Sequence, residues 1–341
     1  MTDLQRSRKT PKKSSPFRRF LKYTLITLLT LFVIVGGVIG YMIYQMSSMT
    51  ASSQQDLERG DKSEYRDEAV DPVEDPISVL FLGLDSRDDN LSGRTDAMLL
   101  ATFNPDDNSI KMINIPRDSL VEIVGRGTRD KINHAHAFGG VDMTIDTVEN
   151  LLDIPVDYVV SLNFVAFMEI VDTIGGVTVD VPMPISDTDN ATYGTIEIDE
   201  GEQTLNGEEA LAYVRMRKQD PRGDLGRGDR QKDVIEAIIR QSADFRTITR
   251  FNSLMDSLDR NMSTNLSFGN MVSMHGYAGD LDDIEQYSFD GYDTTEGGVY
   301  YYVIRDESRA EISQTFKEHL EISQSNSGTA ESTGDGESAR Q

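Results

Sequence analysis

The chain has 341 residues, no cysteine and a formal net charge of −25 at neutral pH. Without cysteine it has no disulfide framework, no thiolate nucleophile and no cysteine-ligated metal. Residues 1–22 contain eight lysines and arginines and a single acid, a net +7 that leaves −32 for the rest of the chain. Because so acidic a surface repels a nucleic-acid backbone, we expect no nucleic-acid binding by the main domain.

An uncharged apolar segment follows the basic N-terminus. Residues 23–44 read YTLITLLTLFVIVGGVIGYMIY and would span roughly 33 Å as a helix, enough for a hydrocarbon core of ~30 Å. A cleaved signal peptide is the alternative, but this apolar run is longer than usual and no good A-x-A site follows it. Since the basic flank predicts a cytoplasmic N-terminus, we expect a single-pass signal-anchor in the cell membrane, with the main domain outside the cell.

Composition divides the chain into regions. They are a basic cytoplasmic tail (1–22), the transmembrane segment (23–44), a polar extracellular tether (45–76), a folded domain (77–322) and an acidic and polar tail (323–341). The tether is charged and ends near two prolines, as linkers often do. The C-terminal tail has almost no apolar residues, so we expect it to be disordered.

Strand and helix patterns alternate within the folded domain. Apolar or β-branched runs predict strands at 77–84, 97–103, 109–115, 158–162, 177–181 and 300–304. Helical periodicity appears at 141–152, 163–174, 231–245 and 310–322. The predicted fold class is therefore α/β, with a central mixed sheet covered by helices as an α-β-α sandwich. The aromatic and aliphatic stripe of the helix at 163–174 fits either the core or the wall of an apolar pocket.

Two carboxylates stand where predicted strands end or begin. Asp85 lies in GLDSR (83–87), after the first strand, and Asp96 lies in RTDAM (94–98), at the start of the next. Such a pair could share a hard cation such as Mg²⁺ together with phosphate oxygens. The simpler alternative, which the pair alone favours, is that each aspartate forms a surface ion pair with its neighbouring arginine.

Two histidines in KINHAHAFGG (131–140) invite a metal interpretation. His134 and His136 are two residues apart, which places them on one face only in a strand, and no third ligand is close in the sequence. We therefore expect them to have a structural or hydrogen-bonding role.

Arginines are concentrated in three further motifs. Arg117 lies in NIPRD (114–118), Arg215 and Arg217 lie in YVRMRK (213–218), and DLGRGDRQ (224–231) contributes Arg227 and Gln231. Arg215 and Arg217 would share one face of a strand, and DLGRGDRQ would open the following helix, whose N-terminus favours anions. In so acidic a domain, converging guanidinium groups favour a bound phosphate over a solvated basic patch. No nucleophile triad, Walker loop or H-E-x-x-H motif is present, and phosphoryl transfer needs only positioning and charge neutralisation.

In this order the motifs resemble those of the LytR-CpsA-Psr family, and in particular of its teichoic acid transferases. The resemblance is carried by the N-terminal anchor and by GLDSR, RTDAM, NIPRD, KINHAHAFGG, IGGV (174–177), YVRMRK and DLGRGDRQ. It covers roughly residues 77–245, and we find no recognisable motif after about Phe245. Asn114 stands where the family often has serine, from which we expect no functional consequence.

The resemblance implies a phosphotransferase that moves an anionic glycopolymer, such as wall teichoic acid, from a polyprenyl-pyrophosphate carrier to a muramic-acid hydroxyl of peptidoglycan. The lipid would lie in an apolar pocket, and Asp85 and Asp96 would hold Mg²⁺, with Mn²⁺ as an alternative, against the pyrophosphate. The implied pyrophosphate-binding residues are Arg87, Arg94, Arg117, Arg215, Arg217, Asp224, Arg227 and Gln231. Catalytic roles fall on Asp96, Arg117, Arg215 and Arg217.

Two other functions stay open. The same residues could hydrolyse polyprenyl pyrophosphate with water as the acceptor, or the domain could bind the lipid pyrophosphate without catalysis and regulate envelope synthesis. The identity of the polymer and of the general base also stays open.

Overall fold

The computed structural model describes residues 55–72, 74–85, 91–188, 194–217, 219–243, 261–267, 270 and 283–322. The chain divides into two compact units, residues 1–49 and 50–341, and every described residue belongs to the second unit. The basic tail, the apolar segment at 23–44 and the tail at 323–341 lie outside the described residues. Within the described ranges, no helix is long and apolar enough to cross a membrane.

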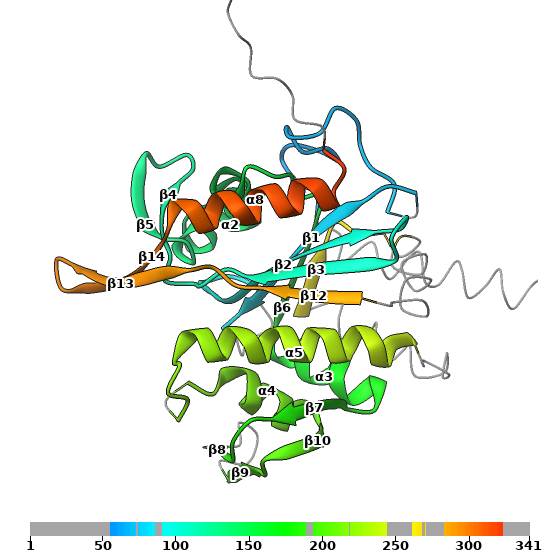
Figure 1. Cartoon of the computed structure of the whole chain (residues 1–341), viewed down its shortest axis with the longest axis vertical. Coiled ribbons are helices and arrows are strands. Elements are labelled where there is room, and N and C mark those ends of the chain that lie inside the picture. Colours follow the sequence, from blue (N-terminus) through cyan, green and yellow to red (C-terminus); the bar gives the residue numbers. More distant parts are fainter. Residues whose placement is uncertain are drawn as a thin grey trace, which may run out of the picture. The chain divides into compact units, whose positions relative to one another are not determined.

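A six-stranded mixed sheet forms the centre of the domain (Figure 1). In spatial order its strands are β11 (Met262–Thr264), β6 (Tyr158–Asn163), β1 (Ile77–Leu84), β2 (Thr95–Asn104), β3 (Ser109–Asn114) and β12 (Asp283–Tyr287). The pairs β1–β6 and β3–β12 are parallel, and the other neighbours are antiparallel. The predicted α/β class with a central mixed sheet is confirmed.

Helices cover both faces of this sheet (Figure 1). Helices α2 (His134–Leu152) and α8 (Asp306–His319) lie on one face, and α3 (Phe164–Ile174), α4 (Gly207–Arg215) and α5 (Asp224–Ala243) lie on the other. Side chains alternate between the two faces along each strand. Leu80 of β1 therefore joins one core with Phe316 of α8, whereas Val79 joins another core against which Ile235 of α5 packs.

Smaller two-stranded antiparallel sheets accompany the central sheet. They pair β4 (Leu120–Ile123) with β5 (Thr128–Lys131), β7 (Val177–Val181) with β10 (Gly201–Leu205), β8 (Ile185–Thr188) with β9 (Thr195–Ile198), and β13 (Gly291–Glu296) with β14 (Val299–Ile304). The β13–β14 hairpin, drawn in orange in Figure 1, projects beyond the sheet. Its second strand is attached to the domain because the amide of Tyr302 donates to the carbonyl of Asp118 at 2.9 Å.

The expected strand at residues 213–217 is wrong, because helix α4 ends at Arg215. Asn206 accepts a hydrogen bond from the amide of Glu209 at 3.0 Å, and Glu209 accepts one from the amide of Asn206 at 2.9 Å. This reciprocal capping box starts the helix at Gly207. Arg215 is thus the last residue of a helix and Arg217 lies beyond it, so they do not share the face of a strand.

The structure also differs from the expected tether. Residues 55–72 lie against the domain, where the side chain of Leu57 joins the core and Ser63 is buried. Arg66 donates to both carboxylate oxygens of Asp157, at 3.0 and 2.7 Å. The sequence suggested that the charged residues of this segment are solvated, but its arginines form ion pairs with buried carboxylates. The folded part therefore begins before Ile77.

Candidate functional site

Asp85 and Asp96 lie at the same end of the paired strands β1 and β2. Gly83 pairs with Ala97 and Leu84 pairs with Thr95, so Asp96 is the extra residue of a bulge. A bulge turns a side chain away from the regular alternation of a strand. Asp85 follows the last residue of β1 and is exposed. The strand geometry therefore presents both aspartates at one edge of the sheet.

Arg117 connects Asp96 to a second carboxylate. One terminal guanidinium nitrogen of Arg117 donates to Asp96, and its Nε lies 3.7 Å from the carboxylate of Asp118. Asp118 is buried and also accepts a hydrogen bond from the amine of Lys131 at 2.7 Å. These contacts orient the guanidinium at the point where Pro116 ends the path of β3.

The first two turns of α5 pack against the ends of β2 and β3. Arg227 is 9% exposed and donates to the backbone carbonyl of Asp96 at 3.2 Å. The side-chain amide of Asn114 donates to Gln231 at 2.7 Å. A Cβ at Gly228 would lie 2.9 Å from the side-chain oxygen of Asn114, so the glycine permits this close approach. Asn114 therefore has a clear structural role, since it positions Gln231.

Arg230 fixes the loop between α4 and α5. It is 1% exposed and donates to Asp220 at 2.5 Å and to the backbone carbonyl of Tyr213 at 3.0 Å. Burial alone would raise the pKa of Asp220, but hydrogen bonds from Arg230 and from the backbone of Arg222 outweigh it, and the pKa is lowered. A Cβ at Gly226 would lie 1.8 Å from a carboxylate oxygen of Asp220. Arg230 is thus a structural anchor.

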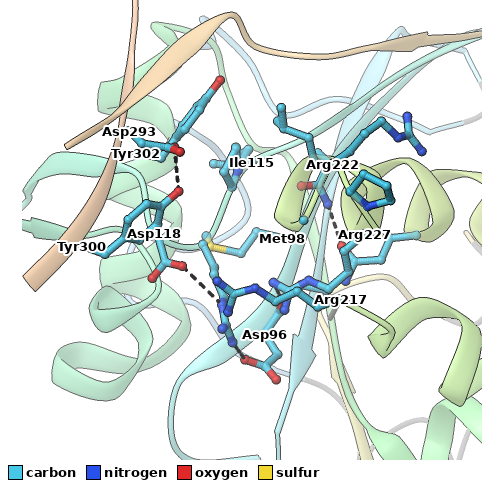
Figure 2. A pocket seen from close by; sticks show the side chains of 18 residues that line it. Asp96, Met98, Ile115, Asp118, Arg217, Arg222, Arg227, Asp293, Tyr300 and Tyr302 are labelled. Atoms are coloured by element: carbon cyan, nitrogen blue, oxygen red, sulfur yellow. Dashed lines mark hydrogen bonds and ion pairs between the residues drawn. The ribbon is translucent and has the colours of Figure 1, made fainter. Parts of the chain in front are cut away.

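A polar cavity of about 320 Å³ lies beside these residues (Figure 2). We call it the polar cavity. It is walled by the ends of β2 and β3, the α4–α5 loop, the start of α5 and the β13–β14 hairpin. Its lining residues are Asp96, Ala97, Met98, Asn114, Ile115, Pro116, Arg117, Asp118, Arg217, Pro221, Arg222, Gly223, Leu225, Arg227, Gln231, Asp293, Tyr300 and Tyr302.

A second cavity, of about 280 Å³, lies between the sheet and helices α3, α4 and α5. We call it the apolar cavity. Its lining residues are Phe81, Leu82, Gly83, Asp96, Ala97, Leu99, Arg117, Leu162, Phe164, Phe167, Leu211, Val214, Arg215, Arg227, Gln231 and Ile235. The guanidinium of Arg215 lies 4.7 Å from the centre of the Phe164 ring, where a cation is attracted to the aromatic face.

The two cavities meet at a charged border. Both are lined by the same set of residues, which are Asp96, Ala97, Arg117, Arg227 and Gln231. Arg217 lines only the polar cavity and Arg215 only the apolar one. A molecule with a charged centre and an apolar tail would find partners for both parts across this border.

Most, but not all, of the predicted site residues come together here. Those that line one or both cavities are Asp96, Arg117, Arg215, Arg217, Arg227 and Gln231. Among the described residues, Asp85 and Arg94 are exposed near this end of the sheet and line neither cavity. Asp224 is the first residue of α5, and its side chain lies outside what the structure describes. Arg87 lies outside the described residues altogether.

The two histidines form hydrogen bonds at the start of α2, as expected. His134 Nδ1 lies 2.8 Å from a carboxylate oxygen of Asp130, and His136 Nδ1 lies 2.9 Å from the carbonyl oxygen of Gly93. Burial lowers the pKa of His136, which favours its neutral form. Across the described part of the chain, no group of three or more His, Asp or Glu side chains is placed to hold a metal ion.

Sequence reasoning missed the hairpin wall of the polar cavity. Asp293, Tyr300 and Tyr302 come from the segment in which we recognised no motif. The run VYYYVI at 299–304 signals a strand, but nothing in it shows which surface the strand will face. The stripe on α3 divides between the two open interpretations: Phe164 and Phe167 line the apolar cavity, whereas Val171 is fully buried in a core.

The sequence is similar to that of a known protein family and its members. The model of the LytR_cpsA_psr family matches residues 40–318. The polyisoprenyl-teichoic acid–peptidoglycan teichoic acid transferase TagU of Halalkalibacterium halodurans is 47% identical over 296 residues, which are 85% of this chain and 95% of the relative. TagU of Bacillus subtilis is 44% identical over 288 residues, or 84% of this chain and 91% of the relative.

Solved structures show the same fold. The structure of Bacillus subtilis TagT is 39% identical, has a TM-score of 0.66 and covers 78% of this chain and 100% of its own. TagT bound to LIIa-WTA is 39% identical with a TM-score of 0.68, covering 78% of this chain and 99% of that one. TagT with bound octaprenyl pyrophosphate lipid is 38% identical with a TM-score of 0.63, again covering 78% and 99%. The chain therefore belongs to the LytR-CpsA-Psr family.

Proposed function

We propose that this chain transfers an anionic glycopolymer, such as wall teichoic acid, from a polyprenyl-pyrophosphate carrier to peptidoglycan. The observation that carries the proposal is the charged border between the two cavities, which offers arginines to a pyrophosphate beside an apolar wall for a lipid. Relatives named as teichoic acid transferases, and a TagT structure that holds octaprenyl pyrophosphate, support it.

In this proposal the donor lies across both cavities. The lipid packs against Phe164, Phe167 and their neighbours in the apolar cavity, and the pyrophosphate lies at the border. Arg117 and Arg227 reach the pyrophosphate from opposite elements, the end of β3 and the start of α5. Planar guanidinium groups suit phosphate oxygens because they present parallel N–H donors. Arg215 and Arg217 would add charge on the lipid side and on the glycan side respectively.

Asp85 and Asp96 fit a bound Mg²⁺ ion only together with the substrate. Asp96 already accepts a hydrogen bond from Arg117, and two carboxylates cannot complete the octahedral set that Mg²⁺ requires. Phosphate oxygens and water would supply the other ligands, as they do in many phosphoryl-transfer sites. When bound, the ion would neutralise charge that develops on the pyrophosphate. Mn²⁺ has the same preference for oxygen ligands and is the alternative.

The reaction is a displacement at the phosphorus that bears the glycopolymer. The oxygen of a peptidoglycan hydroxyl forms a new bond to this phosphorus, and the bond from the phosphorus to the bridging oxygen breaks. Polyprenyl phosphate leaves with the electron pair, and the hydroxyl proton passes to a general base, either a carboxylate of the site or water. Arg117 and Arg227 hold the phosphoryl oxygens and neutralise their charge, which is the main contribution that a protein makes to such a transfer.

We further propose that residues 23–44 anchor the chain in the cell membrane with the N-terminus in the cytoplasm. The support is the uncharged apolar run and its basic flank. A Ser327→Cys variant should react with a membrane-impermeant thiol reagent on intact cells whose wall has been weakened. Labelling only after lysis would place the catalytic domain inside the cell and contradict this topology.

A transfer assay with the full chain tests the function. The purified chain, a synthetic polyprenyl-pyrophosphate glycan and peptidoglycan should yield a phosphodiester between glycan and peptidoglycan together with polyprenyl phosphate. Asp96→Asn should abolish the product, as should chelation of divalent cations, whereas Asp229→Asn should not, because Asp229 pairs with Arg222 at the surface and lines neither cavity.

The alternatives give other products. Polyprenyl phosphate released without a bond between glycan and peptidoglycan would identify a hydrolase. Tight binding of the donor with neither product would identify a non-catalytic regulator.

A further inference from the structure

The polar cavity has two unlike walls. Figure 2 shows Arg217, Arg222 and Arg227 on one side and Tyr300, Tyr302 and Asp293 on the other. The second wall is the β13–β14 hairpin, and residues 291–304 contain no lysine or arginine. The amine of Lys131 lies 5.7 Å from the centre of the Tyr300 ring, but it is paired with Asp118 at 2.7 Å. The aromatic and acidic surface of the hairpin is therefore a poor partner for a phosphate. The hairpin wall therefore suits a ligand whose chemistry differs from that of the phosphate bound by the arginines opposite.

We infer that the hairpin wall binds a sugar ring of the acceptor glycan, an inference that rests on the proposed function. Tyr300 is 36% exposed, and its hydroxyl donates to Asp293 at 2.7 Å. A sugar presents an apolar C–H face, which packs against an aromatic ring, and a rim of hydroxyl donors. A carboxylate has about four acceptor positions, so Asp293 can accept from sugar hydroxyls as well as from Tyr300.

The hairpin is held in a fixed position beside the reacting centre. The amide of Tyr302 donates to the carbonyl of Asp118, the residue after Arg117, at 2.9 Å. The hydroxyl of Tyr302 donates to the carbonyl of Phe289 at 3.0 Å. A Cβ at Gly291 would lie 2.5 Å from the Tyr302 ring, so the glycine leaves space for this ring across the hairpin. A wall fixed in this way can position a ligand instead of merely touching it.

The direction of the reaction assigns this wall to the acceptor. In phosphoryl transfer the attacking and leaving oxygens lie roughly in line on opposite sides of the phosphorus. The leaving group is polyprenyl phosphate, whose lipid occupies the apolar cavity. The attacking hydroxyl therefore arrives from the polar cavity. The donor's own glycan hangs from a different oxygen of the same phosphorus, off this line.

The test measures acceptor and donor separately with the full chain. The probes are a soluble peptidoglycan glycan strand and a polyprenyl-pyrophosphate glycan. Tyr300→Ala should raise the KM for the glycan strand roughly ten-fold or more, because both the ring and the support of Asp293 are lost. The KM for the donor should stay within about two-fold. Tyr300→Phe keeps the ring and loses the hydrogen bond, so it should have an intermediate effect.

The matched control is Tyr292→Ala on the same hairpin. Tyr292 is 51% exposed and does not line the polar cavity, so both KM values should match those of the wild type. Calorimetric binding of the glycan strand without donor gives a second measurement, and Tyr300→Ala should weaken it by the same factor.

Other results would overturn the inference. A rise in donor KM alone would show that the wall holds the donor's sugar, and equal behaviour of Tyr300→Ala and Tyr292→Ala would show that the hairpin binds neither. If Tyr300→Ala transfers the glycan as well as the wild type does, the sugar site at the hairpin is contradicted and the proposed function stays intact. Binding of the glycan strand that requires Tyr300, with no transfer by the wild type, would support the subsite and contradict the function.

Discussion

The two faces of the central sheet differ in what their side chains do. Under α2 and α8, Leu80, Ile145 and Phe316 are at most 1% exposed and belong to one continuous core. On the opposite face, Phe81 and Leu162 are only partly buried and line the apolar cavity. The first face, which we call the closed face, therefore contributes mainly to stability, whereas the second, which we call the open face, combines a core with a binding cavity. Substitutions should separate these two properties.

The largest effect is expected from a pair of phenylalanines on opposite faces. Phe316→Ala empties a fully buried position in the closed core and should lower the free energy of unfolding by about 3–5 kcal/mol. Phe167→Ala removes a partly exposed ring from the cavity wall and should cost only about 1 kcal/mol. Denaturant unfolding of both variants, beside donor binding, measures the contrast.

Donor binding should show the reverse order, with the larger loss in Phe167→Ala. Folded Phe316→Ala should bind the donor normally, whereas Phe167→Ala should bind it weakly. Equal losses of stability in the two variants would show that both faces are packed alike.

The closed face should also make stability depend on pH. His319, at the end of α8, is 5% exposed and forms hydrogen bonds with Thr102 and Ser109 at 2.7 and 2.9 Å. Burial, followed by the charge of Lys111, lowers the pKa of His319 to about 4, against the opposing influence of Asp107 and Glu285.

The unfolded chain, in which this histidine has a pKa near ~6.5, binds the proton first as the pH falls. The contribution of neutral His319 to the free energy of unfolding is therefore complete above pH ~6.5. It is lost between pH ~6.5 and ~4, by about 3 kcal/mol in all. Unfolding measured across this range should show the slope in the wild type. His319→Gln should remove most of it, and a slope that persists in this variant would assign it to other groups.

The arginines of the open face should change activity without changing stability. Arg227 lines both cavities and is 9% exposed. Arg227→Lys keeps the charge but loses the planar donor pair, so transfer should fall about ten- to 150-fold, or roughly 1.5–3 kcal/mol.

Arg222→Lys is the matched control for Arg227→Lys. Arg222 lines only the polar cavity and pairs with Asp229 at the surface, so less than about three-fold should be lost. Thermal unfolding should hardly change in either variant. Full activity in Arg227→Lys would end the assignment of this residue to the pyrophosphate.

The closed face and the strands were largely predictable from sequence, because both depend on local patterns. Continuous apolar runs predicted β1 and β3 closely, and helical periodicity at 163–174 predicted α3, which ends at Gly175 with a φ of 92°. The motifs also predicted most of the charged border, since the strand ends and the first two turns of α5 carry them. The roles assigned to those residues remain predictions.

The remaining features could not be predicted because they depend on contacts between distant segments. One miss was local, because the alternation of Arg215 and Arg217 suggested a strand at the end of helix α4, whose capping box of Asn206 and Glu209 lies one to three turns earlier in the chain. The hairpin wall of the polar cavity requires Tyr302 to meet Asp118, and no local pattern predicts that pairing. The packing of residues 55–72 depends likewise on carboxylates far along the chain, such as Asp157.

The smallest expected change in stability concerns two valines, one on a cavity wall and one in a filled core. It gives the sharpest test of the difference between cavity and core, because the sign of the change should differ between the two substitutions. Both valines belong to one core, but Val214 of α4 is 9% exposed and lines the apolar cavity, whereas Val234 of α5 is fully buried and lines neither cavity. Val214→Phe adds apolar atoms to open space, so stability should stay level or rise by about 0.5–1 kcal/mol. Val234→Phe adds the same atoms to a filled space and should cost about 1–3 kcal/mol.

Ligand binding should then separate the two variants again. The added ring of Val214→Phe occupies space that the lipid would use, so donor affinity should fall although the protein is at least as stable as the wild type. Val234→Phe, where it stays folded, should bind the donor more nearly as the wild type does. Thermal unfolding beside donor binding tests both statements. A destabilised Val214→Phe variant would show that the space beside Val214 is filled and would contradict the contrast between the two valines.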